Sequence, residues 1–383
     1  MNYQLTTTFR RDELIYNNDV DMIGSGGFGI VYRCQLRNSQ SNSSEIVALK
    51  VLATPYKLRQ KELGAFMQEA SILKSLVDCP HIVRFLGLCI DPGHYAIVME
   101  YVEYGNLQDM LLSGVDEHPV IKQWNCRIRM AADIAKGMNY LHSRVKPIIH
   151  GDLKTANVLV DHNYCCKIID FGLAKVREIS EQTPRDQPRA GTVSFTAPEV
   201  FEAKVEKGKE KKVDVYSYAI VLWQLKELKC VNAGVNHAVI RANVVVGVRP
   251  PLSNDDECLE EYRDLIVRCW NAEPDVRLHF KEIVTMCVGM IKQYESLHEV
   301  EQRKEVCEVY RNIIETYLEG PNGYDASCDK LLNVKIGLSA IETAHGSGSD
   351  DLEHDLNISA AKLLEQATDS LKDRLCSGTY PAN

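Results

Sequence analysis

Apolar and β-branched residues recur in short runs over the first hundred residues, and polar stretches separate these runs. Ile30–Cys34 and Ile46–Leu52 have this character, and the polar stretch between them predicts a loop at Asn38–Glu45. Tyr95–Tyr101 is a further run of the same kind. Short runs rich in β-branched and aromatic residues are typical of strands, so this part of the chain predicts a mainly β region.

Later stretches show helical spacing instead. Phe66, Glu69 and Leu73 are three and four positions apart, which predicts an amphipathic helix that carries a carboxylate on its apolar face. Trp124–His142 has apolar residues at the same spacing, which predicts a long supporting helix. Asp214–Leu225 is apolar nearly all round, and such a helix is expected to be buried at the centre of a helical region.

A glycine-rich segment lies between the first residues and the first strand. Within Ile23–Val31, Gly24, Gly26 and Gly29 form the pattern G-x-G-x-x-G-x-V. A glycine triplet also opens dinucleotide-binding βαβ units, in which the loop leads into a helix. This chain continues as a strand instead, which favours a hairpin that covers phosphates.

Lys50 lies between apolar neighbours in the second strand run. One interpretation is an edge-strand lysine in solvent, because lysine side chains are usually exposed. A buried lysine would need a negatively charged partner. Glu69, on the apolar face of the following helix, needs a cation in the same way, so we expect the two side chains to pair.

The run Ile148–Gly172 carries the residue types that phosphoryl transfer requires. It contains His150-Gly151-Asp152, Lys154, Asn157 and Asp170-Phe171-Gly172. The chemistry needs a carboxylate to orient the attacking hydroxyl, a cation for the γ-phosphate and oxygen ligands for Mg²⁺. Asp152 and Lys154 are the candidates for the first two roles. Asn157 and Asp170 are the candidate metal ligands.

In sequence order, these motifs resemble those of the protein kinases. The resemblance covers about Asp21–Met290 and continues through Gly191-Thr192, Ala197-Pro198-Glu199, Asp214 with Tyr216-Ser217, and Arg277. It implies an α+β fold of two lobes, a small mainly β N-lobe and a larger mainly α C-lobe. It also implies that Asp214 steadies the backbone of the catalytic loop and that Glu199 pairs with Arg277.

The resemblance assigns a role to each candidate site residue. Asp152, Lys154, Lys50 and Glu69 would be catalytic, and Asn157 and Asp170 would hold Mg²⁺. Glu100 to Val102 would form the hinge that meets adenine, with Met99 as the gatekeeper. The full set expected to contact ATP is Ile23, Gly24, Gly26, Gly29, Val31, Ala48, Lys50, Met99, Glu100, Val102 and Leu159.

Further residues indicate the kinase class. Lys154, two positions after Asp152, and Thr192 match serine/threonine kinases, while Val246–Pro251 and Cys269-Trp270 resemble the tyrosine-kinase-like group. Within that group, the chain is most similar to the receptor-interacting serine/threonine kinases. The resemblance implies transfer of phosphate to serine or threonine on a protein. The alternative is a pseudokinase, or nucleotide-binding scaffold, that signals by conformation and tail-mediated assembly.

Gly151 departs from the family pattern, which has an arginine at this position. That arginine normally binds a phosphate on the activation loop, so its loss removes the usual switch. We therefore expect constitutive competence, or control by dimerisation or by the tail. Ser180 and Thr183 are candidate phosphorylation sites, whereas Thr192 is expected to be an ordinary polar loop residue.

Composition and charge add the cellular context. No apolar run approaches the ~20 residues that span a bilayer. The 13 cysteines include no C-x-x-C pair, and this pattern indicates free thiols in a reducing, cytoplasmic setting. The net charge is −9, and the residues after Lys292 hold 8 Lys+Arg against 17 Asp+Glu. No basic surface for nucleic acid is indicated.

These observations predict three parts of the chain. Residues 1–20 would be an N-terminal extension, 21–290 the kinase domain, and 291–383 an acidic, partly helical C-terminal tail with linkers. The expected partners are a protein substrate and a second copy of the chain or a signalling adaptor, with no nucleic acid and no insertion into a membrane.

Overall fold

The computed structural model describes residues 7–26, 29–38, 43–52, 60–76, 79–91, 93–113, 117–176, 192–254 and 258–297. The chain divides into two compact units, Met1–Gln293 and Tyr294–Asn383, and the elements described below belong to the first. Ser180, Thr183 and the expected helices and linkers of the tail after residue 297 lie outside the described residues.

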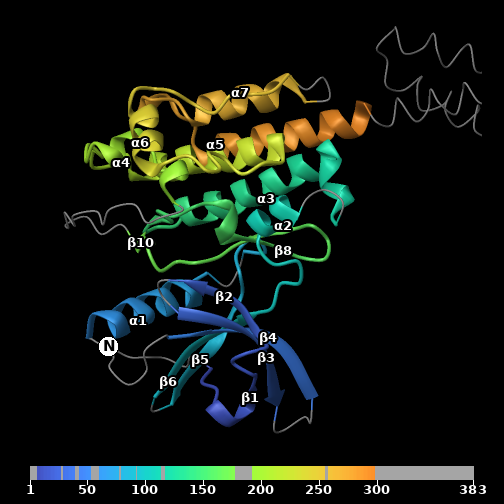
Figure 1. Cartoon of the computed structure of the whole chain (residues 1–383), viewed down its shortest axis with the longest axis vertical. Coiled ribbons are helices and arrows are strands. Elements are labelled where there is room, and N and C mark those ends of the chain that lie inside the picture. The colour runs from blue at the N-terminus through green and yellow to red at the C-terminus, as the bar shows by residue number, and fades with distance from the viewer. Residues whose placement is uncertain are drawn as a thin grey trace, which may run out of the picture. The chain divides into compact units, whose positions relative to one another are not determined.

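The first part of this unit is built on a six-stranded antiparallel sheet (Figure 1). Its strands are β1 (Leu14–Ile15), β2 (Met22–Gly26), β3 (Gly29–Asn38), β4 (Ser43–Val51), β5 (Phe85–Asp91) and β6 (His94–Glu100). The strand order is β1-β3-β4-β6-β5, and β2 pairs with β3. The predicted mainly β region is therefore confirmed.

The two faces of β4 have different surroundings because side chains alternate along a strand. Val47 and Leu49 belong to a buried apolar cluster on one face of the sheet. Ala48 and Lys50 alternate with them and therefore lie on the other face. In the ladder, Lys50 is opposite Val31 on β3.

The polar stretch expected to be a loop at 38–45 is partly strand. β3 continues to Asn38 and β4 begins at Ser43, so Leu36 pairs with Glu45 and Asn38 pairs with Ser43. The prediction of a loop over this whole stretch was wrong because paired backbone groups extend the ladder even where the exposed side chains are polar.

The segment before the glycine hairpin packs on the sheet. The Phe9 amide donates to the Leu88 carbonyl, and the Leu88 amide donates to the Thr7 carbonyl. A Cβ at Gly87 would collide with the Thr7 carbonyl oxygen, so the close approach of the two segments requires glycine. Leu14 is fully buried in the sheet core.

Helices make up most of the remainder. They are α1 (Gln60–Lys74), α2 (Leu107–Ser113), α3 (Trp124–His142), α4 (Pro198–Phe201), α5 (Glu210–Glu227), α6 (His237–Val245) and α7 (Glu260–Cys269), and residues 280–293 are also helical. Short strands accompany them: β7 (Ile148–Ile149) pairs with β10 (Lys175–Val176), and β8 (Val158–Val160) pairs with β9 (Cys166–Ile168).

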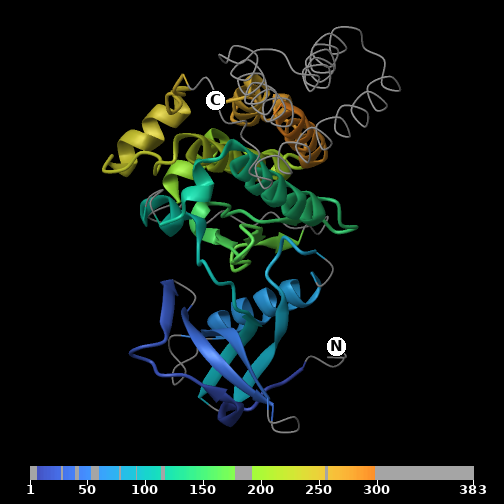
Figure 2. The ribbon, with the colours of Figure 1, turned by 90° about the vertical axis from the view of Figure 1, so that its right-hand side faces the viewer.

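The C-lobe core forms around α3 and α5, as their patterns predicted. α3 has the predicted bounds, and nearly every residue of α5 is buried. The Tyr218 hydroxyl on α5 donates a hydrogen bond of 2.8 Å to the Ala131 carbonyl on α3. Figures 1 and 2 show the sheet and α1 as one lobe and the remaining helices as a second, which confirms the two-lobed α+β fold. Within the described ranges, no helix is both long and apolar enough to cross a bilayer.

Candidate active site

Asp214 holds the backbone of the catalytic loop. Its two carboxylate oxygens accept hydrogen bonds of 2.9 Å from the amides of His150 and Gly151, and His142 Nε2 lies 2.8 Å from one of them. Asp214 lies in the first turns of α5 and is fully buried. Burial raises the pKa of Asp214, but the hydrogen bonds from His142 and from the Gly151 amide outweigh it, so the pKa is lowered overall.

His150 links the catalytic loop to the segment of Asp170. Its Nδ1 accepts a hydrogen bond from the Asp152 amide at 3.2 Å, and its Nε2 lies 3.0 Å from the Ile169 carbonyl oxygen. The two contacts fit the neutral tautomer with hydrogen on Nε2. The ring also packs against the buried Phe171 ring, with centroids 5.4 Å apart. The imidazole therefore fixes the orientation of both segments.

The Asp152 carboxylate is the centre of a polar cluster. Lys154 Nζ donates to Oδ2 at 2.8 Å, and Asn157 Nδ2 donates to the same oxygen at 3.1 Å. The Thr192 hydroxyl donates to Oδ1 at 2.9 Å. Both oxygens are thus fixed in place, and Oδ1 faces Thr192, which lies 40 residues further along the chain.

A second cluster forms around Lys50. Its Nζ lies 2.6 Å from Glu69 Oε1 on α1 and 3.3 Å from Asp170 Oδ1. The side chains of Lys50 and Glu69 are 13% and 5% exposed, so the edge-strand interpretation in solvent was wrong. Burial lowers the pKa of Lys50, but the two carboxylates outweigh it and raise the pKa overall, so the ammonium stays charged.

Asp170 has a left-handed backbone, with φ of 64°. Such a φ is uncommon for a residue other than glycine and occurs where the surroundings fix the conformation. Burial raises the pKa of Asp170, but the charge of Lys50 and the hydrogen bonds from Lys50 and the Gly172 amide outweigh it and lower the pKa overall, so the group remains a carboxylate. The Ile169 amide donates to the Asn157 carbonyl at 3.0 Å, which joins this cluster to that of Asp152.

The residues expected around the nucleotide lie on adjacent strands and the hinge. Gly24 pairs with Val31, and Gly26 pairs with Gly29, across the β2–β3 hairpin. A Cβ at Gly29, where φ is 148°, would collide with the Val51 carbonyl oxygen. Only glycine therefore fits at this position of the hairpin.

The hinge residues leave the sheet at the end of β6. Met99 is opposite Ala48 in the ladder, and both are buried. The Glu100 carboxylate accepts hydrogen bonds from the Arg84 amide and from Lys167 Nζ. These two bonds fix the side chain of this hinge residue. The expected set also includes Val102, which is buried, Ile23, which is 49% exposed, and Leu159, which forms an isolated bridge with Asn106.

Asn157 and Asp170 fit the expected role of magnesium ligands by donor type. Both bonds described for the Asn157 side chain use Nδ2, toward the Asp152 carbonyl and carboxylate, so the amide offers Oδ1 to a cation. Asp170 offers carboxylate oxygen, and Mg²⁺ prefers oxygen ligands. Among the described residues, no cluster of three or more His, Cys, Asp or Glu side chains provides another metal site.

Glu199 and Arg277 form a buried ion pair in the C-lobe. Arg277 donates to both carboxylate oxygens, at 2.7 Å and 2.9 Å, and the guanidinium is fully buried. This bidentate geometry confirms the predicted pairing.

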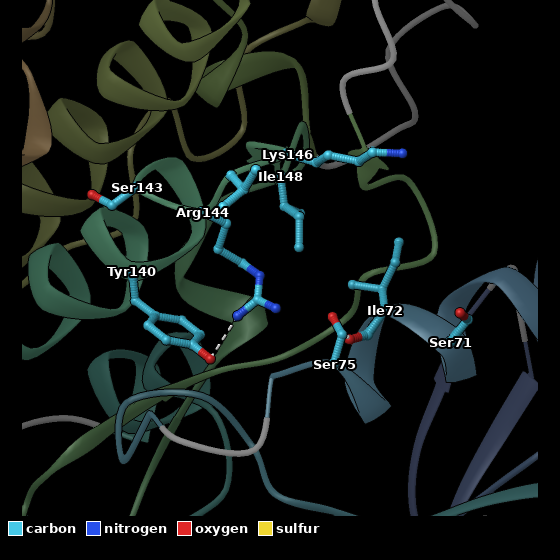
Figure 3. A pocket seen from close by; sticks show the side chains of 9 residues that line it. Ser71, Ile72, Ser75, Tyr140, Ser143, Arg144, Lys146 and Ile148 are labelled. Carbon is cyan, nitrogen blue, oxygen red and sulfur yellow. Dashed lines mark hydrogen bonds between the residues drawn. The ribbon is translucent and has the colours of Figure 1, made fainter. Parts of the chain in front are cut away.

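A cavity of about 690 Å³ lies between α1 and the end of α3 (Figure 3). Ile72 and Ser75 reach it from α1, and Ile148 reaches it from β7. Arg144 extends beside it and donates a hydrogen bond of 2.8 Å to the Tyr140 hydroxyl (Figure 3). None of the residues that line it belongs to the two clusters described above.

Comparison with known families identifies the chain. Residues 18–287 match the family described as protein tyrosine and serine/threonine kinase. The chain belongs to this protein kinase family. The matched region begins just before the glycine hairpin and contains both clusters of the kinase site.

Named relatives of this kinase domain are similar over the same region. The probable serine/threonine-protein kinase drkD of Dictyostelium discoideum is 37% identical over 71% of the chain, and the dual specificity protein kinase shkA of the same organism is 36% identical over 69%. The serine/threonine-protein kinase CTR1 of Arabidopsis thaliana is 34% identical over 72%. The chain spans only 20%, 47% and 32% of the length of these relatives. The narrower likeness to receptor-interacting kinases stays a prediction.

Thr192 is more than the ordinary polar residue expected in the kinase loop. Its hydroxyl also accepts a hydrogen bond of 3.0 Å from Lys154 Nζ, so it bridges the two side chains of the catalytic loop. Its place in the Gly-Thr pair indicated the class of the kinase, but no spacing in the sequence indicates a contact across 40 residues.

Proposed function

We propose that this kinase domain transfers the γ-phosphoryl group of ATP to serine or threonine hydroxyls of a protein. The main support for the proposal is the short contact between Lys50 and Glu69. It joins the sheet to α1 and holds the lysine in the position from which kinases bind the phosphates of ATP. Retention of both clusters argues against the pseudokinase alternative.

The proposed roles follow from position and charge. Lys50, held by Glu69, would bind the α- and β-phosphates beneath the glycine hairpin. Asp152 would orient the acceptor hydroxyl and take its proton, and Lys154 would neutralise charge on the transferring group.

Asn157 and Asp170 would hold magnesium, which supplies positive charge that neutralises the phosphate oxygens. The backbone of the hinge at Glu100 and Val102 would bind adenine, between apolar residues that include Ala48 and Leu159. The remaining expected contacts, Ile23 and Val31, would cover the ring from the glycine hairpin.

The setting and partners of the kinase are also proposed. Ten cysteines in the described part of the chain are free thiols, which supports a reducing compartment such as the cytoplasm. Gly151 supports activity that does not wait for a phosphate on the activation loop. The acidic residues after Lys292 support assembly with a second copy or an adaptor.

The test is incorporation of labelled phosphate from Mg·ATP into a serine- and threonine-containing peptide mixture, followed by phosphoamino-acid analysis. Asp152→Asn should lower the rate by about 10²- to 10⁴-fold and leave ATP binding intact. Asp264→Asn, at an exposed position of α7, is the matched control and should keep the full rate. Full ATP binding without any phosphate transfer would favour the nucleotide-binding scaffold instead.

A further inference from the structure

The cavity between α1 and the end of α3 has the size of a ligand site. Its volume is about 690 Å³, and sites for small molecules typically have volumes of about 300–1,000 Å³. Ile72 and Ser75 line it from α1, and Tyr140 and Arg144 line it from the end of α3 and the residues just after that helix (Figure 3). The cavity is therefore large enough for a small organic molecule that contacts both elements.

The Arg144 guanidinium lines this cavity without an anionic partner. Its Nη1 donates a hydrogen bond of 2.8 Å to the Tyr140 hydroxyl, and its central carbon lies 5.3 Å from the centre of the Tyr140 ring. Within the part of the chain that the structure describes, neither these contacts nor any other pairs Arg144 with a carboxylate. An arginine side chain carries five N–H donors, so most of the guanidinium remains available to a ligand. Tyr140 fixes its orientation, as the dashed line in Figure 3 indicates.

Both walls of the cavity are formed by segments that contain no acidic residue. Residues 70–77, on the side of α1, include Lys74 and no Asp or Glu. Residues 134–151, on the side of α3, include three basic residues and no Asp or Glu. Two of these basic residues, Arg144 and Lys146, line the cavity, and its described lining has no carboxylate. Positive charge that the walls do not balance favours an anionic ligand.

The cavity also offers apolar surface beside this charge. Ile72 and Ile148 line it and are almost fully buried, so their positions are fixed by the surrounding packing. Val145, which lies between the two basic residues, also lines the cavity and is fully exposed. A simple inorganic anion would leave this apolar surface in water, and an uncharged hydrocarbon would leave Arg144 unpaired. A ligand with an anionic head and an apolar body satisfies both parts of the cavity.

We propose that this cavity binds a small amphiphilic anion, which consists of a carboxylate or phosphate head on an alkyl chain. The head would accept hydrogen bonds from Arg144 and from the Tyr140 hydroxyl, which accepts from Arg144 and can donate its own hydrogen to the ligand. The alkyl chain would lie against Ile72 and Ile148. Ile72 belongs to α1 and Ile148 belongs to β7, which precedes the catalytic loop, so the ligand would join these two elements.

The test measures binding of small probes to the full chain without ATP, so it does not depend on the proposed function. Octanoate and octyl phosphate carry the two heads on one alkyl chain, octanol has the chain without charge, and acetate and inorganic phosphate are heads without a chain. Isothermal titration calorimetry should show one site for an amphiphilic anion, with a Kd about tenfold or more below those of octanol and the bare heads. Tighter binding of octanoate would identify a carboxylate head, and tighter binding of octyl phosphate a phosphate head; each supports the proposal.

Arg144→Gln tests the charged part of the cavity, because it removes the charge and keeps a polar side chain. It should weaken binding of octanoate by about 10- to 100-fold and leave binding of octanol unchanged. Arg144→Lys retains the charge and should lose less affinity than Arg144→Gln. Arg268→Gln is the matched control, because Arg268 is an exposed arginine of α7 that pairs with Asp264, and it should bind octanoate as the unmodified chain does.

Ser75→Leu tests the apolar part of the cavity. Ser75 is exposed at the end of α1, and its hydroxyl donates a hydrogen bond of 2.7 Å to the Ile72 carbonyl. Leucine at this position would occupy part of the cavity and should weaken binding of octanoate by about tenfold or more. Ser113→Leu is the matched control, because Ser113 is exposed at the end of α2 and donates to the Met110 carbonyl in the same way. It should keep full binding.

Three results would overturn the proposal. Neither amphiphilic anion binds the unmodified chain, octanol binds as tightly as octanoate, or octanoate binds Arg144→Gln or Ser75→Leu as tightly as the unmodified chain. Urea unfolding of each variant verifies that weaker binding occurs in a folded protein, and if one of the two variants does not fold, the other decides. A kinase that transfers no phosphate would contradict the proposed function and leave these binding results unchanged.

Discussion

Thr192 donates a hydrogen bond of 2.9 Å to Asp152 Oδ1 and accepts one of 3.0 Å from Lys154 Nζ. The hydroxyl thereby joins the segment that precedes α4 to the two charged side chains of the catalytic loop. Because neither Asp152 nor Lys154 contacts another residue of that segment among the described hydrogen bonds, Thr192 sets how the segment meets the acceptor site.

Thr192→Ala should lower kcat by about 10- to 100-fold, since a hydrogen bond to a charged group contributes about 1.5–3 kcal/mol. Thr192 acts through Asp152 and Lys154, so KM for ATP should stay the same. Thr192→Ser retains the hydroxyl and should recover most of the rate. The matched control is Thr285→Ala, where the hydroxyl bonds only to the Lys281 carbonyl in the described part of the chain. A large rise in KM for ATP in Thr192→Ala would contradict the positioning role.

Glu69→Gln should lower kcat/KM for ATP by about 100-fold, because Lys50 would then move toward its second partner, Asp170, and lose its position. The fold should survive, since glutamine has the same shape and can still hydrogen bond. Steady-state kinetics with varied ATP provides the measurement. Ser71→Ala, at an exposed position of α1, should have no effect. An equal loss of kcat/KM in Glu69→Gln and Ser71→Ala would mean that the substitutions disturb α1 as a whole and do not act through the ion pair.

Asp214→Asn should lower the free energy of unfolding at pH 7 by about 3–5 kcal/mol, because it removes the charge that His142 and two loop amides bind. The folded pKa of Asp214 is below its ordinary value of 3.8. Its contribution to stability is therefore complete above pH 3.8 and is lost as the pH falls through the folded pKa.

Urea unfolding of both proteins from pH 7 down to about pH 3 measures this contribution. The difference in the free energy of unfolding between wild type and Asp214→Asn should be constant from pH 7 to about pH 5. It should become smaller only below the ordinary pKa of an aspartate. A difference that changes near pH 6.5 would assign the effect to a histidine instead.

Two glycines in helices should respond in opposite directions to alanine. A Cβ at Gly64 in α1 meets nothing within 4 Å, so Gly64→Ala should raise the free energy of unfolding by about 0.5–1 kcal/mol. A Cβ at Gly137 in α3 would lie 2.8 Å from Ile168 Cδ1 and 2.9 Å from the His81 carbonyl oxygen, so Gly137→Ala should lower it by about 1–3 kcal/mol. Denaturant titration of the pair provides the measurement, and the same sign for both would contradict the described packing.

The sequence was sufficient for the architecture because its periodicities were unambiguous. The bounds of α3 agree with its apolar spacing, and the helix expected from Asp214 is buried on all sides as predicted. It begins one turn earlier than predicted, at Glu210, because the residues before Asp214 are polar and carry no apolar signal. The polar stretch around Ser43 was assigned wrongly, because its strand is set by pairing with β3 and not by its own side chains.

The candidate site was predictable where two residues each needed an opposite charge. The partner of Lys50 could be inferred from the carboxylate on an apolar helix face, and the 2.6 Å contact confirms it. The role of Thr192 could not be inferred, because a hydroxyl needs no ion pair and its partners are set by tertiary folding. The left-handed backbone of Asp170 gave no local signal either, since aspartate tolerates many conformations.

The position of Asp214 determines which parts of this kinase can rearrange without unfolding of the C-lobe. The carboxylate that fixes the catalytic loop belongs to a helix buried on all sides, so that loop cannot be released without opening the C-lobe core. Lys50 and Glu69, by contrast, belong to a strand and a helix that are joined at the site by one ion pair. Switching off by a reversible rearrangement is therefore expected at the junction of sheet and α1, while loss of the catalytic loop should coincide with global unfolding.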